Sequence, residues 1–584
     1  MLYEKLETLE NIGDRGPLFL REDGGETKYS FSGLIAKARG ILVHLQARGL
    51  GKGDRVGIIV PDSEQFILAF LGAMMGGIIP VPIYPPSVPG KTDLYLESTR
   101  TILEASQAKA LIVQRSVMPL FERLSQLPHS PKFLLVSEDL LTPIGIEPKI
   151  VGLTPEDTCF LQFTSGSTAA PKGVVVSHGN VAANANAMLR DALSVDPKSD
   201  IGVSWLPLYH DMGLVGTVLA ALLQEVPVVY LPTLSFIKNP NVWMSTVSKY
   251  RGTITFGPNF AFALAARRAQ EKHVRELELS CLRVLGCGAE PINIEVLRRF
   301  QQAFAPAHLD PRAILPCYGM AEATLAISFH RSKAPLRCQR IEGAARTRES
   351  FLDSPQPCDG STFTEIVSCG TSLPGHQIAI VSPHGERLAD GNVGEIVFKG
   401  PSVTQGYHDN AEATRQTYRD GWLHTGDLGF MREGELFVAG RSKDMIIING
   451  RNYFPQDVEW AAEKVNGIRP GCVVAFGIEN AGTEKLVVVA ETKHRSSLPD
   501  LECELREAIV SALGILLAQA VFIPAGTLPK TTSGKVQRQK TKTAYEQGML
   551  GQMQIMESTG ERAGSESSHG AQDREPTRRL ATVE

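Results

Sequence analysis

The sequence lacks a CxxC pair, an excess of basic residues and any apolar run of about 18 residues, the length that a membrane-spanning helix needs. Its nine cysteines are scattered, which is typical of free thiols in a reducing compartment and not of a disulfide framework or a zinc site. The formal net charge of -4 disfavours a nucleic-acid-binding protein. The first residues do not show a basic segment followed by an apolar run, so no signal peptide is expected. We therefore expect a cytoplasmic protein without a membrane span.

No internal repeat is visible, and the chain is rich in apolar residues instead. With 584 residues, 43% of them hydrophobic, it can bury a large core but is too long for one compact domain. Apolar spacing predicts a helix over 30–48, a strand over 55–60 and a second helix over 63–75. Such alternation favours an α/β fold with helices on both faces of a sheet. We expect a large N-terminal domain of α/β layers and a small C-terminal α+β domain on a hinge.

The stretch from Thr164 to Gly173 is dense in small and hydroxyl-bearing residues and contains one lysine, Lys172. It lies between two apolar segments, 157–163 and 174–178, which both predict strands. Small residues let backbone N–H groups approach an anion closely, and hydroxyls and a lysine add further donors. The alternative is an ordinary Ser/Thr/Gly surface turn. No Gly-Lys-Ser/Thr opens a helix here, so the spacing is not that of a P-loop.

This loop resembles the phosphate-binding signature of the acyl-adenylate-forming superfamily, which includes acyl-CoA synthetases, luciferases and peptide-synthetase adenylation domains. Ala169 departs from the signature, because many members carry glycine there. The departure removes no phosphate-binding group. The resemblance implies that ATP is bound and that its phosphates contact Thr164, Ser165, Gly166, Ser167, Thr168 and Lys172.

Two further segments carry the resemblance to the nucleotide site. The segment 284–291 is an apolar strand that ends in a glycine-rich turn, and 315–324 reads Leu-Pro-Cys-Tyr-Gly-Met-Ala-Glu-Ala-Thr. Taken alone, the first would be an ordinary strand-to-helix turn. The contacts that the resemblance implies are Gly288, Ala289 and Glu290 in one wall of the adenine pocket, Tyr318 stacked on adenine, and Gly319 or Thr324 beside the phosphate.

The resemblance also assigns residues to the metal and to the ribose. Glu322 would coordinate Mg²⁺, an ion that favours carboxylate and phosphate oxygens; the alternative is a solvated helix residue. Asp427, expected in a tight turn, would accept hydrogen bonds from the ribose diol, or would simply be a turn residue. Arg441 would reach the ribose or phosphate, or would be a surface charge.

The segment 204–214 contains a His-Asp pair before a predicted helix. Asp211 could be a helix N-cap, and a lone histidine is more often structural than catalytic. In the superfamily this histidine position lies near the acyl-binding site. We therefore assign His210 to substrate positioning.

The likeness implies a domain boundary and a catalytic lysine near the C-terminus. Residues 1–440 would form the large adenylating domain, 441–444 the hinge with Lys443 as pivot, and 445–550 the small mobile domain. The segment 551–584 is Ser/Gly/Glu-rich and is expected to be disordered. Lys535, after Ser533-Gly534, would bind the substrate carboxylate and the α-phosphate together. The alternative is a basic loop, because other cations lie close by.

The polar stretch 331–365 resembles the insertion of fatty acyl-AMP ligases, the branch that passes acyl groups to carrier proteins. The segments 80–86 and 205–214 resemble that branch as well. The likeness implies activation of a fatty acid with ATP and Mg²⁺, followed by transfer to an acyl carrier protein. An insertion without functional meaning is the alternative. Two other functions stay open: an acyl-CoA synthetase, and a nucleotide-binding regulatory protein without turnover.

Overall fold

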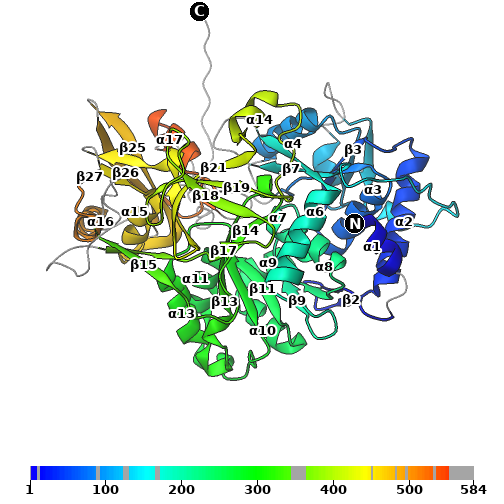
Figure 1. The fold of residues 1–584 in the computed structure, drawn as a ribbon, viewed down its shortest axis with the longest axis horizontal. Helices are drawn as coiled ribbons and strands as arrows, with labels where there is room; N and C mark the ends of the chain where they lie inside the picture. Colours follow the sequence, from blue (N-terminus) through cyan, green and yellow to red (C-terminus); the bar gives the residue numbers. More distant parts are fainter. Residues whose placement is uncertain are drawn as a thin grey trace, which may run out of the picture.

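The computed structural model describes residues 2–9, 13–86, 92–122, 131–164, 171–342, 363–448, 451–480, 483–492, 498–530 and 535–550. Figure 1 shows a large lobe, coloured blue to green, beside a small yellow and orange lobe formed by the C-terminal part of the chain. The predicted fold class, mixed α/β with a large N-terminal and a small C-terminal domain, is confirmed. No helix in the described ranges is both long and apolar enough to cross a membrane.

The first sheet of the large lobe has four parallel strands, in the order β4 (Ile79–Pro82), β3 (Arg55–Ile59), β5 (Ala110–Val113) and β6 (Phe133–Val136). Helices α2 (Phe31–Ala47) and α3 (Ser63–Met75) pack against each other beside it. The predicted span of α3 is confirmed, because the Asp62 carboxylate caps its first turn and Gly76 follows its last residue. Both helices bury most of their apolar side chains in one core cluster.

A larger sheet of nine strands forms the centre of the molecule. Four of its neighbouring strands are parallel, in the order β13 (Ile314–Gly319), β12 (Val284–Gly288), β11 (Ile254–Pro258) and β9 (Gly202–Ser204). Their carboxyl ends therefore meet along one edge. In open α/β sheets, ligands bind beyond this edge, where the loops after the strands converge.

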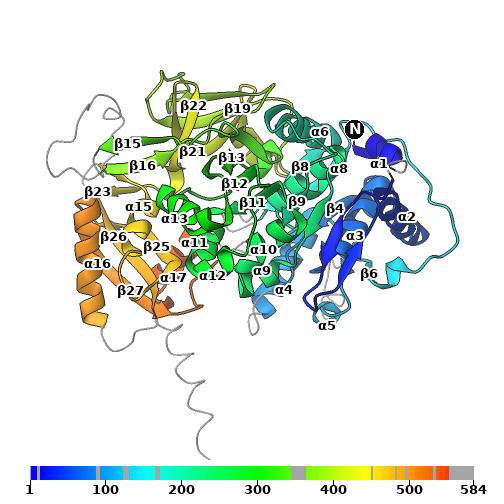
Figure 2. The same cartoon turned by 90° about the horizontal axis from the view of Figure 1, so that it is seen from below.

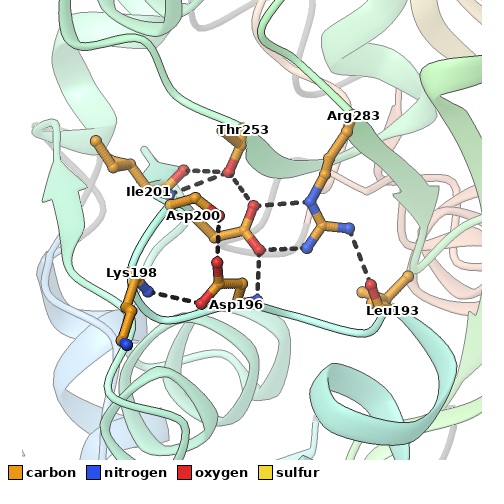
Figure 3. A network of polar contacts seen from close by, with 8 residues as sticks. Leu193, Asp196, Lys198, Asp200, Ile201, Thr253 and Arg283 are labelled. Atoms are coloured by element: carbon orange, nitrogen blue, oxygen red, sulfur yellow. Dashed lines mark hydrogen bonds and ion pairs between the residues drawn. The ribbon is translucent and has the colours of Figure 1, made fainter.

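The opposite ends of the same strands are held together by a buried ion pair (Figure 3). Asp200, which is 4% exposed, accepts from Arg283 Nε at 2.7 Å and from Arg283 Nη2 at 2.5 Å. The hydroxyl of Thr253 donates to Asp200 Oδ1 at 2.7 Å. Thr253 directly precedes β11 and Arg283 directly precedes β12, while Asp200 lies two residues before β9. This network therefore fixes the amino ends of three strands.

An antiparallel sheet leads from the large lobe to the small one. Strand β19 (Gly394–Lys399) pairs with β21 (Trp422–Arg432), which pairs in turn with β22 (Glu435–Arg441). The predicted hairpin tip at Glu433-Gly434 is confirmed, and both residues have positive φ angles of 52° and 77°. A short 3₁₀ turn, η8 (Ser442–Asp444), follows β22.

The small lobe contains a three-stranded sheet, β25 (Ile468–Asn480), β26 (Thr483–Thr492) and β27 (Leu517–Pro524). Helices α15 (Pro455–Ala462) and α16 (Leu498–Leu513) share a core cluster with the strands. Figure 2 shows the yellow and orange elements of this lobe at the left, beside the green helices of the large lobe.

One helix and two strands lie where the sequence indicated polar, irregular chain. Helix α17 (Arg538–Glu546) occupies part of what could have been a basic loop. Strands β15 (Cys338–Glu342) and β16 (Phe363–Val367) form an antiparallel ladder in a stretch without sustained periodicity. The central part of the predicted insertion, 343–362, lies outside the described residues, and so does the predicted disordered tail, 551–584.

Candidate active site

The carboxyl ends of the parallel strands bring together most of the residues assigned from the sequence. Gly288 ends β12, Tyr318 and Gly319 end β13, and the segment with His210 follows β9. Gly319 has no room for a side chain, because a Cβ there would lie 2.0 Å from the carbonyl oxygen of Leu325. The nucleotide-binding wall that the motifs imply is therefore built on neighbouring strands of one sheet.

Asp427 lies at the centre of a hydrogen-bonded group of three residues. The Tyr318 hydroxyl donates to Asp427 Oδ2 at 2.7 Å, and Arg441 Nε donates to Asp427 Oδ1 at 3.2 Å. Burial raises the pKa of Asp427, whereas the Arg441 guanidinium opposes this shift. Burial also raises the pKa of Tyr318 well above its usual value. Each carboxylate oxygen of Asp427 therefore accepts a hydrogen bond that fixes its orientation.

The expectation that Asp427 lies in a tight turn was wrong. Asp427 lies inside β21, at a bulge where the register with β19 shifts. The Thr425 hydroxyl donates to the Ile396 carbonyl at 2.7 Å and accepts from the Asp427 N–H at 3.1 Å. A bulge re-aims a side chain within a strand, and here it directs Asp427 toward Tyr318.

Glu322 is a buried carboxylate in the 3₁₀ turn η7 (Ala321–Ala323). The Tyr407 hydroxyl donates to Glu322 Oε1 at 2.7 Å, and Lys172 Nζ lies 5.0 Å from the centre of the Tyr407 ring. Burial raises the pKa of Glu322, and the hydrogen bond from Tyr407 opposes this shift. The segment with Tyr407 joins β8 (Lys172–Ser177), because the Val175 N–H donates to the Gly406 carbonyl at 2.9 Å.

Thr324 has a strained backbone directly after η7. Its φ of 72° and ψ of -54° are unusual for a β-branched residue, and its hydroxyl donates to the Ser402 carbonyl at 2.6 Å. Such strain is concentrated at functional sites in proteins. Ala289, in the turn after β12, also has a positive φ of 67°. Both unusual conformations therefore lie in segments assigned to the nucleotide site.

His210 and Asp211 lie at the start of a helical segment, as predicted. His210 Nδ1 lies 2.6 Å from Asp211 Oδ1, and the Met212 N–H donates to the same carboxylate oxygen at 2.7 Å. Burial would raise the pKa of Asp211, but His210 and Lys535 outweigh it and lower the pKa. The following residues form a π-helical segment, η4 (Leu214–Leu219), a geometry that is frequent at functional sites.

Lys535 of the small lobe interacts electrostatically with acidic groups of the large lobe. Burial lowers the pKa of Lys535, whereas the carboxylates of Glu290 and Asp211 favour its charged form. Glu290 follows β12, and its Oε1 accepts from the Phe260 N–H at 2.6 Å. Burial raises the pKa of Glu290, and Lys535 opposes that shift. The ammonium therefore lies in the electrostatic field of the candidate site.

The predicted phosphate loop can be placed only at its two ends. Thr164 ends β7 (Thr158–Thr164) and is paired with Lys172 at the start of β8. The loop does connect two strands, as the sequence indicated. Its remaining assigned residues, Ser165, Gly166, Ser167 and Thr168, lie outside the described residues.

A metal would have to share its ligands with the nucleotide. The described residues contain no group of three or more His, Cys, Asp or Glu side chains that could hold an ion. Mg²⁺ usually takes one or two carboxylates and completes its shell with water and substrate phosphates. The buried Glu322 carboxylate, oriented by Tyr407, fits this requirement.

Two residues in or near the site were missed or undervalued from the sequence. Tyr407 was not singled out, because its pairing with β8 joins residues more than 200 positions apart and leaves no local signal in the sequence. Arg538 is one of the cations that lie close to Lys535 in the sequence, and it forms a partly buried ion pair with Glu459.

Comparison with protein families identifies the chain. The family described as "AMP-binding enzyme" matches residues 14–408. The chain belongs to the AMP-binding enzyme family. A second family, "Disco-interacting protein 2-like, AMP domain", matches residues 443–555. Members of the AMP-binding enzyme family form adenylates, which agrees with the nucleotide motifs.

Similar proteins support the same placement within this AMP-binding enzyme family. A protein from Caulobacter vibrioides, provisionally named an acyl-CoA synthetase, is 36% identical over 513 residues, 87% of this chain and 88% of its own length. The medium-chain-fatty-acid–[acyl-carrier-protein] ligase JamA from Moorena producens is 32% identical, over 92% of this chain and 93% of its own. A solved structure from a study of fatty acyl-adenylate ligases of E. coli and L. pneumophila has a TM-score of 0.85 and 32% identity, and the match covers 94% of this chain and 98% of that one. The resemblance to the fatty acyl-AMP ligase branch is thereby confirmed.

Proposed function

We propose that this protein activates a fatty acid with ATP to an acyl-adenylate, releases pyrophosphate, and then transfers the acyl group to the phosphopantetheine thiol of an acyl carrier protein. The fatty acyl-adenylate ligases and the carrier-protein ligase among its similar proteins support this proposal. Among the structural observations, the electrostatic attraction between the Lys535 ammonium and the carboxylates of Asp211 and Glu290 carries it. A cation at this point can reduce the repulsion between a carboxylate and a triphosphate.

In the proposed first step, a carboxylate oxygen of the fatty acid attacks the α-phosphorus of ATP. The new bond joins carboxylate oxygen to phosphorus, and the bond from phosphorus to the bridging oxygen breaks, so that its electron pair leaves with pyrophosphate. Both reactants are anions. Lys535 would bind the carboxylate and the α-phosphate together, while His210 would position the acyl end of the substrate. Holding both reactants in line accounts for much of the rate increase in such reactions.

The nucleotide would lie along the carboxyl edge of the central sheet. Tyr318 would stack on adenine against the turn Gly288-Ala289-Glu290, and Asp427 would accept from the ribose diol with Arg441 beside it. Gly319 would lie beside the phosphate, and the loop from Thr164 to Lys172 would bind the leaving group. Glu322 would hold Mg²⁺, which supplies charge neutralisation to the phosphates when bound.

The second step requires a different face of the small lobe. We propose that residues 445–550 rotate about a hinge at 441–444, with Lys443 as the pivot, after the adenylate has formed. Lys535 would then leave the site and the thiol of the acceptor would enter. The 3₁₀ turn η8 between β22 and the small lobe is consistent with a hinge at this position.

The proposed role of Lys535 predicts a specific loss. Lys535→Ala is expected to lower carboxylate-dependent pyrophosphate exchange by at least about 100-fold, because it removes the cation between two anions. ATP binding, measured by calorimetry, should change less than about threefold, since most nucleotide contacts lie in the large lobe. Lys540→Ala, at an exposed position of the following helix, is the matched control. Undiminished exchange in Lys535→Ala would contradict the assignment.

The acceptor is decided by a direct comparison. Wild-type protein, ATP and laurate are mixed with either coenzyme A or a holo-carrier protein, and acyl transfer is followed by mass spectrometry. The proposal expects transfer to the carrier and little acyl-CoA. Robust acyl-CoA formation at ordinary coenzyme A concentrations would favour the second candidate, an acyl-CoA synthetase, which the Caulobacter protein's name suggests for that protein. Absence of any pyrophosphate exchange with several fatty acids would favour a nucleotide sensor instead.

A further inference from the structure

Arg538, near the end of the small lobe, contacts the proposed hinge and a helix that both lie about 80 or more positions earlier in the sequence. Its Nε and Nη2 donate to the two carboxylate oxygens of Glu459, each at 2.7 Å, and its Nη1 donates to Asp444 Oδ2 at 3.3 Å. Glu459 belongs to α15, whereas Asp444 ends η8 at the proposed hinge. Arg538 itself begins α17, 94 positions after Asp444. One side chain therefore joins the linker, a core helix and the end of the lysine-bearing segment.

This contact is largely removed from solvent. The side chains of Arg538 and Glu459 are 20% and 8% exposed. The two parallel N–H···O bonds fix the orientation of the guanidinium plane, which a lysine could not do. Glu459 is held in turn, because its Oε1 also accepts from the Ala475 N–H of β25 at 3.1 Å.

The same segment is constrained on the side of Lys535. Val536 forms an antiparallel bridge with Lys530, and the Gln537 N–H donates to the Pro529 carbonyl at 2.9 Å. These contacts hold Val536 and Gln537, the two residues that directly follow Lys535. Only Val536 and Gln537 separate Lys535 from Arg538, so the anchoring of Arg538 limits where the lysine backbone can lie.

We propose that Arg538 is a positioning residue for the first half-reaction, which fixes the segment carrying Lys535 to the linker through Asp444 and to α15 through Glu459. This inference rests on the proposed function, since it assumes that Lys535 acts in adenylation and leaves before thiol transfer. A lysine side chain is long and flexible, and a displacement of about 1 Å in a reacting constellation can cost about 100-fold in rate. Anchoring of its backbone at a nearby residue reduces that displacement.

The test uses the full chain and separates the two half-reactions. Carboxylate-dependent pyrophosphate exchange reports the first, and acyl transfer to the thiol from supplied lauroyl-adenylate reports the second. Arg538→Lys retains the charge but loses the paired hydrogen bonds. We expect the kcat of its exchange reaction to fall at least about 10-fold, with the KM for ATP and the transfer rate changed less than about threefold. Lys540→Ala, on the exposed surface of the same helix, should match the wild type in both assays.

Several outcomes would overturn the inference. Equal exchange by wild type and Arg538→Lys would do so, and so would equal losses in both half-reactions, because these would assign Arg538 a general structural role. If the melting temperature of Arg538→Lys falls below the assay temperature, Asp444→Asn takes its place under the same criteria, since it keeps the pair with Glu459. A wild type without exchange would refute the proposed function itself, which distinguishes the two failures.

Discussion

Tyr407 joins parts of the site that lie far apart in the sequence. Its hydroxyl donates to Glu322 Oε1 at 2.7 Å, and the ammonium of Lys172 lies over its ring. Groups that hydrogen-bond a metal-binding carboxylate orient it, and their loss typically lowers metal affinity about 10- to 100-fold. At the scale of the residue, the proposed metal site at Glu322 therefore depends on Tyr407, a side chain to which we assign no contact with the metal or the nucleotide.

Tyr407→Phe is expected to raise the Mg²⁺ concentration needed for half-maximal ATP binding by about 10-fold or more. The reason is that the Glu322 carboxylate loses the donor that orients it. Calorimetric titration of ATP at a series of Mg²⁺ concentrations measures this effect without turnover. Tyr29→Phe is the matched control, since Tyr29 donates to Glu64 at 2.6 Å in another part of the large lobe. Identical Mg²⁺ dependence in Tyr407→Phe and wild type would refute the role.

Motifs singled out several residues that the structure brings together, but they did not predict how those residues are held. Tyr318, Glu322, Asp427 and Arg441 were assigned from short stretches of sequence, and the structure brings Tyr318, Asp427 and Arg441 into contact. The bulge that aims Asp427 could not be read, because it depends on the register between β19 and β21. Partners more than a hundred positions away, such as Tyr318 for Asp427, leave no local signal in the sequence.

At the scale of secondary structure, the Asp200–Arg283 pair holds the amino ends of the strands whose carboxyl ends form the site (Figure 3). Asp200→Asn should destabilise the large lobe by about 3 kcal/mol, because it leaves the Arg283 guanidinium partly buried without its counter-charge. Denaturant unfolding at neutral pH measures this loss. Asp191→Asn is the control, since the neighbouring pair of Asp191 with Arg190 is more exposed and should contribute little.

The stability difference between wild type and Asp200→Asn should depend on pH, which gives a second check. Burial would raise the pKa of Asp200, but Arg283 and Thr253 outweigh it and the pKa is lowered. A carboxylate with a lowered folded-state pKa contributes stability above its unfolded pKa of about 3.9 and loses it as the pH falls through the folded value. The difference in the free energy of unfolding between wild type and Asp200→Asn should therefore be largest at pH 7 and decrease below about pH 3.9. A gap that grows on acidification would contradict this account.

Elements with local signals were predicted, and those held by distant contacts were not. The span of α3 could be read because its cap, its apolar stretch and its glycine end lie within a few residues. The ladder of β15 with β16 could not, since its strands join across residues 343–362 and β16 is fixed to α13 (Ile294–Phe304) by the Arg298–Glu365 pair at 2.6 Å. Helix α17 is mostly polar and is held by the Arg538–Glu459 pair and by the packing of Ala544 against the small lobe's sheet.

At the scale of the whole molecule, the two lobes have mostly separate cores. Two core clusters contain only residues of the small lobe. Phe454 is the exception, because it joins a cluster with Phe430 and Phe437 of the antiparallel sheet. Gly440 lies against it, and a Cβ at Gly440 would be 2.4 Å from the Phe454 ring. Apart from this cluster, the described residues of the two lobes bury their apolar side chains in separate cores, which suits rotation of one lobe against the other.

The β15–β16 ladder gives the final prediction, because it extends from the large lobe and lies beside the small lobe in both views (Figures 1 and 2). Glu342 and Phe363 are directly paired, so residues 343–362 can be replaced by Asn-Gly, a two-residue turn that preserves the ladder.

If residues 343–362 restrict the small lobe after adenylation, their replacement should raise coenzyme A use relative to carrier use at least about 10-fold. Pyrophosphate exchange should change less than about threefold. Initial rates of lauroyl-CoA and lauroyl-carrier formation measure the ratio. A chain that ends at Leu550 controls for simple shortening, and an unchanged ratio in the Asn-Gly variant would show that acceptor choice is set elsewhere.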